Sequence, residues 1–145
     1  MYKKMKYLSE DAKRIREEVF VREQGFENEF DEIDDFATHL VFYEGEEPIA
    51  VCRYYKSENP KEYWVGRLAI LKQYRGRQIG RYMLEVMEEN IKEEGGAKIS
   101  LSAQVRVQDF YGKMGYLPQG EAYLDEHCQH VHMEKKLYSS QYQKK

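Results

Sequence analysis

The spacing of apolar residues near the start of the chain predicts an amphipathic helix. Ile15 and Val19 are four residues apart, as on one face of a helix. Ser9 is a good N-cap, and the two acids that follow it suit the positive end of a helix dipole. We therefore expect a helix over residues 10–23 that ends near Gly25.

Three runs rich in β-branched and aromatic residues come next and predict strands. Residues 38–43 and 49–55 flank a turn that contains Gly45 and Pro48, so they are expected to pair as an antiparallel hairpin. The run at residues 63–71 is mostly apolar, as expected of a strand at the centre of a sheet.

The middle of the chain returns to helical spacing. Apolar residues recur every four positions at Ile79, Met83, Met87 and Ile91. This stripe predicts a helix that Gly95 and Gly96 end. A strand is expected at residues 98–103, paired in parallel with the preceding strand through a right-handed crossover. A shorter helix at 105–114 and a last strand at 130–137 complete an α/β fold with helices on a mixed, partly antiparallel sheet.

Length and composition fit a single globular domain. The chain has 145 residues, of which 41% are hydrophobic and 34% charged. We expect one domain over residues 1–138 and a polar tail at 139–145. No apolar stretch approaches the ~20 residues of a membrane span, and a net charge of −3 argues against nucleic acid as the main partner. Cys52 and Cys128 are too few for a disulfide framework, so a cytoplasmic protein is expected.

Positive charge is concentrated between the predicted strand at 63–71 and the helix that follows it. The cationic residues there are Lys72, Arg75, Arg77 and Arg81. No acid lies between Gly66 and Arg81. A turn at a helix N-terminus directs backbone N–H groups and the positive end of the helix dipole at one point. The segment therefore predicts a seat for the pyrophosphate of a cofactor.

Negative charge is concentrated in the segment 27–35, which contains six acids and no base. The acids are Glu27, Glu29, Asp31, Glu32, Asp34 and Asp35. Such a run is either a solvated loop or a surface that attracts cations. Both interpretations are open at the level of sequence.

Two short segments resemble signatures of the GNAT acetyltransferase superfamily. Residues 75–80, RGRQIG, are similar to the motif Arg/Gln-x-x-Gly-x-Gly/Ala, with Gln78 in place of the inner glycine. Residues 110–116, FYGKMGY, are similar to the signature FYxKxGF and follow at the right distance. Further blocks resemble the ElaA/YjcF-type branch of the superfamily, at residues 15–24, 31–39 and 120–133. The resemblance thus covers most of the chain.

This resemblance implies an acetyl-CoA-dependent enzyme with a mixed, mostly antiparallel central sheet, a splayed parallel strand pair and helices on both faces. The implied pyrophosphate-binding residues are Arg75, Gly76, Arg77, Gln78, Ile79, Gly80 and Arg81. Backbone groups of Leu68, Ala69 and Ile70 would bind the pantetheine arm as an added strand does. The implied cofactor site also includes Gln104, Tyr111 and Lys113. No metal is implied.

The resemblance also implies a catalytic role for Tyr111, because in the family this tyrosine lies beside the cofactor sulfur and can protonate the departing thiolate. The expected acceptor is a primary amine of a small molecule or peptide, acetylated by direct transfer. Many relatives carry a carboxylate where this chain has Arg67. The candidate bases are Glu23, Asp35 and His130, or a water chain that leads to them. A homodimer is left open.

Other interpretations stay open as well. Gln78 and the missing strand carboxylate allow a non-catalytic CoA-binding or regulatory module, and the acidic segment allows an interaction domain for a basic partner. Cys128, His130 and His132 are ligand types suited to zinc, but their spacing matches no standard site, so no metal site is predicted.

Overall fold

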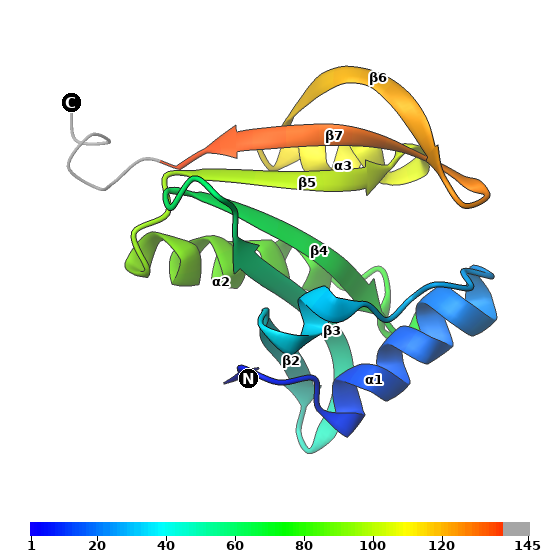
Figure 1. The fold of residues 1–145 in the computed structure, drawn as a ribbon. Helices are drawn as coiled ribbons and strands as arrows, with labels where there is room; N and C mark the ends of the chain where they lie inside the picture. Colours follow the sequence, from blue (N-terminus) through cyan, green and yellow to red (C-terminus); the bar gives the residue numbers. More distant parts are fainter. Residues whose placement is uncertain (138–145) are drawn as a thin grey trace. The chain divides into compact units, whose positions relative to one another are not determined.

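Residues 1–137 are described by a computed structural model, and the predicted tail at 139–145 lies outside the described residues. The described strands form a seven-stranded sheet in the order β1-β2-β3-β4-β5-β7-β6. Figure 1 labels the strands β2 to β7. The strands are β1 (Tyr2–Met5), β2 (Thr38–Glu44), β3 (Glu47–Lys56), β4 (Glu62–Ile70), β5 (Lys98–Gln104), β6 (Leu117–Asp125) and β7 (Cys128–Lys136). β4 and β5 are parallel, whereas β1–β2, β2–β3, β5–β7 and β6–β7 are antiparallel. The predicted mixed, mostly antiparallel sheet is confirmed.

The helices are short, except for α2. They are α1 (Glu10–Arg16), α2 (Ile79–Glu93) and α3 (Gln108–Lys113), together with the helical turns η1 (Glu17–Glu23), η2 (Glu32–Asp35), η3 (Lys72–Tyr74) and η4 (Val105–Val107). Among the described residues, none of these helices is long and apolar enough to cross a membrane.

The chain forms two compact units. The first comprises Met1–Tyr55 and Gly66–Leu84, and the second comprises Lys56–Val65 and the chain from Glu85 onward. β4 and α2 each contribute residues to both units. The expectation of a single domain over residues 1–138 stays a prediction.

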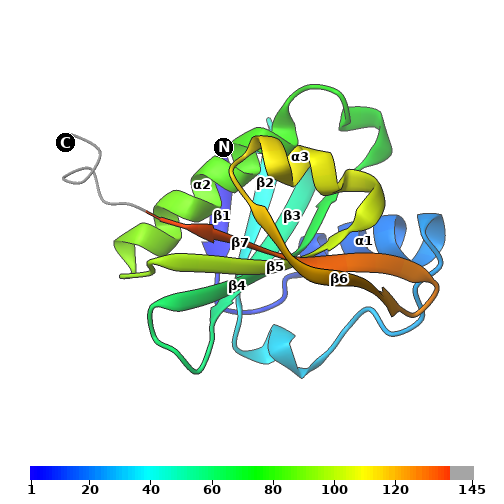
Figure 2. The ribbon, with the colours of Figure 1, turned by 90° about the horizontal axis from the view of Figure 1, so that it is seen from above.

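In the first unit, β1, β2 and β3 run side by side (Figure 2). The side chains of Leu40 and Phe42 on β2 are buried in its core. Ser9 caps α1, because its hydroxyl accepts the N–H of Ala12 at 3.2 Å. The predicted helix over residues 10–23 is confirmed in extent, but its second half, η1, is a π-helix. The helical segment ends before Gly25, whose φ is +78°.

In the second unit, β5 pairs with β7 along its whole length, from Lys98↔Lys136 to Gln104↔His130. Figure 1 shows these two strands side by side and pointing in opposite directions. The second half of α2 is fixed in this unit by Glu88, a buried acid. Its carboxylate accepts hydrogen bonds from the Tyr116 hydroxyl and from Lys135 Nζ, each at 2.9 Å.

Two strands at sheet edges have no counterpart in the sequence prediction. β1 is short and mostly exposed, and its two central residues are lysines, so it lacks an apolar face. Every residue of β6 is exposed, and the strand contains Pro118 and Gly120, which argue against a strand. Each of the two strands is stabilised by backbone pairing with its neighbour, β1 with β2 and β6 with β7. Neither has a hydrophobic pattern of its own.

Candidate functional site

The basic segment after β4 folds into a turn with two left-handed residues. Gly76 has φ +81° and Gln78 has φ +63°, with one residue between them. α2 begins directly afterwards, and the N–H of Tyr82 donates to the carbonyl of Gln78 at 3.3 Å. The amides of Ile79 and Gly80 therefore precede the first hydrogen bond of the helix. Turns of this kind at a helix N-terminus form anion-binding concavities.

The cationic side chains of this turn have different surroundings. Arg75 is held in place: its two Nη atoms donate to the carboxylate of Glu23 at 2.6 and 2.7 Å, and its Nε donates to the Ile70 carbonyl at 2.9 Å. Arg77 is more than half exposed and contacts Glu44 at 3.3 Å. Arg75 thus ties the turn to η1 and to the end of β4, whereas Arg77 has its charge near solvent.

β4 changes its conformation in its middle. Its parallel register with β5 ends at Val65↔Leu101, although β4 itself continues to Ile70. Arg67 follows two residues after Val65 and has φ +53°, which a residue with a Cβ rarely adopts. The backbone cost of this conformation is about 1–2 kcal/mol. Leu68, Ala69 and Ile70, predicted to contact the cofactor, come directly after this interruption.

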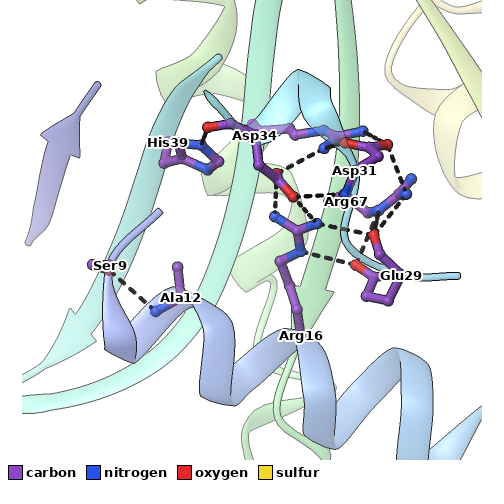
Figure 3. A network of polar contacts seen from close by, with 9 residues as sticks. Ser9, Ala12, Arg16, Glu29, Asp31, Asp34, His39 and Arg67 are labelled. Atoms are coloured by element: carbon purple, nitrogen blue, oxygen red, sulfur yellow. Dashed lines mark hydrogen bonds and ion pairs between the residues drawn. The ribbon is translucent and has the colours of Figure 1, made fainter. Parts of the chain in front are cut away.

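The acidic segment is drawn into a network of ion pairs within the first unit (Figure 3). Arg16, which is 1% exposed, donates from Nε to Glu29 at 2.8 Å and from Nη1 to Asp34 at 2.7 Å. We call the network the arginine–carboxylate cluster; its members are Arg16, Arg53, Arg67, Glu29, Asp31 and Asp34.

Arg53 and Arg67 complete this cluster. Arg53 is buried, and its Nη1 donates to both Asp31 and Asp34 at 2.7 Å. Arg67 lies with its Nε 2.9 Å from a carboxylate oxygen of Glu29, and its Nη2 lies 3.3 Å from Asp31. Arg67 and Asp31 are the partly exposed members, and the other four are buried.

The cluster neutralises half of the negative charge of the acidic segment. Three of its six acids face three guanidinium groups, so the cluster has no net charge. Burial by itself raises the pKa of Asp34, but hydrogen bonds and charge from Arg16 and Arg53 outweigh it and lower this pKa to about 2. For Glu29, burial prevails over its arginine partners and raises the pKa. Half of the acids in the segment are therefore paired with arginines of the protein itself. The segment attracts an external cation less strongly than its six acids alone would suggest.

Three residues that the sequence predicts for the cofactor site belong to the second unit and lie at the end of β5 and on α3. Gln104 is the last residue of β5 and the register partner of His130 on β7. α3 begins four residues later and carries Tyr111 and Lys113. The ring of Tyr111 packs edge-on against Tyr116, with centroids 5.9 Å apart.

His130 is 6% exposed, and its surroundings define its tautomer. Its Nδ1 lies 3.0 Å from the carbonyl oxygen of Cys128. Since a carbonyl only accepts, Nδ1 is the donor of this hydrogen bond, and in the neutral form of the ring the lone pair is on Nε2. Tyr123 stacks on the ring at 6.2 Å, and its hydroxyl is hydrogen-bonded to Ser102. Sequence reasoning missed Ser102 and Tyr123, because neither belongs to a motif.

Glu23 and Asp35, the other candidate bases, lie in the first unit. Both carboxylate oxygens of Glu23 accept from Arg75. Asp35 is exposed at the end of η2. Among the described residues, no group of three or more His, Cys, Asp and Glu side chains is arranged to hold a metal ion.

Comparison with known proteins identifies the family. Residues 5–137 match the family described as Acetyltransferase (GNAT) domain. This chain belongs to the GNAT family. It is 33% identical over 128 residues to the uncharacterized N-acetyltransferase YjcF of Bacillus subtilis, covering 86% of this chain and 90% of that protein. The GNAT and ElaA/YjcF-type resemblance of the sequence is thus confirmed.

Solved structures carry the same GNAT fold. A Lactobacillus plantarum protein described as an N-acetyltransferase matches with a TM-score of 0.85 and 28% identity, over 94% of this chain and 99% of that chain. The crystal structure of Escherichia coli ElaA matches with a TM-score of 0.80 and 24% identity, over 93% of this chain and 98% of that one. The latter likeness concerns the fold. The chain is therefore a member of a family of CoA-dependent acyltransferases.

Proposed function

We propose that this protein transfers the acetyl group of acetyl-CoA to a primary amine of a small molecule or peptide. The observation that carries the proposal is the turn before α2, where Gly76 and Gln78 are left-handed and the amides of a helix N-terminus follow. Membership of the GNAT family supports a CoA thioester as the donor. Direct transfer needs no covalent intermediate on the protein.

The turn is proposed to bind the diphosphate of the cofactor. The amides at 77–80 donate to the phosphate oxygens, and the exposed Arg77 neutralises part of their charge. Arg75 acts indirectly in this proposal, since its guanidinium is already bound to Glu23 and Ile70 and keeps the turn in place. The peptide groups of residues 68–70 bind the pantetheine arm as an added strand does.

The chemical step requires a base and an acid. The acceptor amine must lose a proton as its nitrogen forms a bond to the thioester carbonyl carbon, and the thiolate gains a proton when the carbon–sulfur bond breaks. We assign the first role to His130, because an imidazole whose Nδ1 donates to a carbonyl accepts a proton at Nε2, in preference to Asp35 and to Glu23, which Arg75 binds. We assign the second role to Tyr111.

A test of the cofactor site compares two charge reversals on exposed arginines. Arg77→Glu is expected to weaken CoA binding at least tenfold, which equals about 1.4 kcal/mol, because it replaces attraction of the diphosphate by repulsion. Arg22→Glu is the matched control, since Arg22 is exposed and pairs with Glu18 at 3.1 Å. Calorimetry with CoA measures both. Equal affinities in the two variants would contradict the placement of the diphosphate.

A test of the chemistry uses release of free thiol from acetyl-CoA in the presence of polyamines, amino sugars, amino acids and basic peptides. Tyr111→Phe is expected to lower kcat about a hundredfold with CoA affinity unchanged, because it removes the proton donor only. The exposed Tyr7→Phe serves as the matched control. Full turnover in Tyr111→Phe would remove this hydroxyl from the mechanism, and CoA binding without thiol release across the panel would contradict the enzymatic proposal.

A further inference from the structure

Arg67 combines an unusual backbone conformation with a side chain held by a distant segment. Its backbone is left-handed within β4, and its side chain reaches the acidic segment (Figure 3). We propose that Arg67 is a positioning residue for acyl-CoA: residues 29–31 hold its guanidinium, and this hold keeps the second half of β4 in the conformation that presents its peptide groups to the pantetheine arm. The inference rests on the proposed function and concerns the same cofactor site.

The backbone of β4 departs from a regular strand at residue 67. A regular strand would continue its register with β5 past Val65, but the register ends there and the left-handed residue, Arg67, lies two positions further on. One left-handed residue turns the direction of all peptide groups after it. Residue 67 therefore determines how the N–H and C=O groups of Leu68 and Ile70 are directed.

The side chain of Arg67 is held at several points. The Nε and Nη2 atoms of Arg67 donate to the carbonyl oxygen of Glu29 at 3.2 and 2.9 Å. Its Nε also lies 2.9 Å from the Glu29 carboxylate, and its Nη2 contacts Asp31 at 3.3 Å. These contacts come from both the main chain and side chains of one short segment. They hold the guanidinium at a defined distance from the strand.

The acidic segment is itself anchored independently of Arg67. Arg16 bonds Glu29 and Asp34, and Arg53 bonds Asp31 and Asp34. Both arginines are buried, whereas Arg67 is partly exposed. Loss of Arg67 therefore leaves the anchoring pairs in place, and its effect can be measured in a folded protein.

Two substitutions separate the tether from the backbone conformation. Arg67→Ala loses the contacts and leaves a residue that disfavours positive φ, whereas Arg67→Gly loses the same contacts but adopts φ +53° readily. We expect the KM for acetyl-CoA to rise about tenfold or more in Arg67→Ala and by less in Arg67→Gly, with the KM for the acceptor unchanged. Arg22→Ala, which removes an exposed arginine, is the matched control and keeps wild-type values.

Glu29→Gln tests the same tether from the other side, because it removes the carboxylate charge that faces Arg67 and Arg16 and leaves the sequence of β4 unchanged. It is expected to raise the KM for acetyl-CoA in the same direction as Arg67→Ala. Wild-type KM in both Arg67 variants would overturn the proposal. A rise in the acceptor KM alone would also overturn it, because Arg67 would then bind the acceptor directly.

The crystal structure of Arg67→Ala separates this inference from the proposed function. If the wild-type protein fails to bind CoA, the proposed function fails, but the tether is still tested by the backbone at residue 67. Relaxation of residue 67 to an extended φ in this variant supports the tether. Retention of φ near +53° without the guanidinium contradicts it.

Discussion

Gln78 and Arg67 are two residues with side chains in a backbone conformation that suits glycine. Their φ values are +63° and +53°. Arg67 has a local compensation, because its guanidinium bonds to the main chain and carboxylates of residues 29–31. Gln78 is exposed and its side chain makes no hydrogen bond to the described residues. The strain at Gln78 is therefore uncompensated locally, and the turn is held by Arg75 instead.

Gln78→Gly is expected to leave the free energy of unfolding unchanged or to raise it by up to about 1 kcal/mol, because relief of the left-handed strain exceeds the added chain entropy. Gln73→Gly is the matched control. Gln73 is exposed one turn earlier and does not have a positive φ, so its replacement should lower the free energy of unfolding by about 0.5–1 kcal/mol. Urea denaturation measures both. Equal losses in the two variants would contradict this account of the turn.

At the scale of elements, a glycine after α2 and a glycine within α3 differ in how closely other residues pack around them. α2 is followed by Gly95, with φ +95°, and then by Gly96. A Cβ built on Gly96 would overlap the side chain of Ile91 and lie 2.8 Å from the Tyr63 ring, so the chain leaves the helix in contact with the second unit's own core. Gly112 in α3 has open space where its Cβ would lie. A side chain is therefore excluded by close packing at position 96 but not at position 112.

Gly96→Ala is expected to lower the free energy of unfolding by about 1–3 kcal/mol, because the new methyl group overlaps Ile91 and the Tyr63 ring. Gly112→Ala is the matched control, since it adds a methyl group into open space within a helix and should raise stability by about 0.5–1 kcal/mol. Thermal and urea unfolding measure both. A neutral Gly96→Ala would show that the helix end relaxes at little cost.

At the scale of the whole molecule, the arginine–carboxylate cluster joins segments that are far apart along the chain. Its hydrogen bonds span 13 residues from Arg16 to Glu29 and 38 residues from Glu29 to Arg67. The cluster therefore links α1, the acidic segment, β3 and β4 within the first unit. Because a buried charge without its partner is costly, the loss of Asp34, which is buried and pairs with both Arg16 and Arg53, affects the elements that carry these arginines.

Low pH should lower the stability of the first unit, because Asp34 becomes protonated. Its pKa in the folded protein, about 2, is below its ordinary value of 3.8, so its contribution is present above about pH 4 and is lost as the pH falls through 2. The loss is about 2 kcal/mol. Glu29 acts in the opposite sense, because its raised pKa makes its contribution largest at low pH.

Asp34→Asn should therefore lower stability at pH 7 by about 3–5 kcal/mol, since Arg16 and Arg53 lose an anionic partner. It should also flatten the decline of stability between pH 5 and 2, as measured by urea unfolding at several pH values. Glu32→Gln, an exposed change in the same segment, should keep the wild-type profile. An unchanged acid profile in Asp34→Asn would contradict the assignment.

Local signals sufficed to predict most elements, including the turn before α2. The four-residue recurrence from Ile79 to Ile91 predicts α2, and the basic glycine turn before it predicts an anion seat without reference to any distant segment. The family followed from motifs at the turn and around Tyr111, and it is confirmed. The edge strands β1 and β6 escaped prediction, because their stability comes from neighbouring strands and not from their own composition.

The amino-acid order alone thus specified the helices, the central strands and the family, since each depends on residues within a few positions of one another. It left open what the acids at 27–35 do. Their partners, Arg16, Arg53 and Arg67, come from three separate elements, and no spacing rule pairs them. Folding alone brings these charges into contact, because the choice of an ion-pair partner and the cost of burying it depend on distance in space and not on distance along the chain.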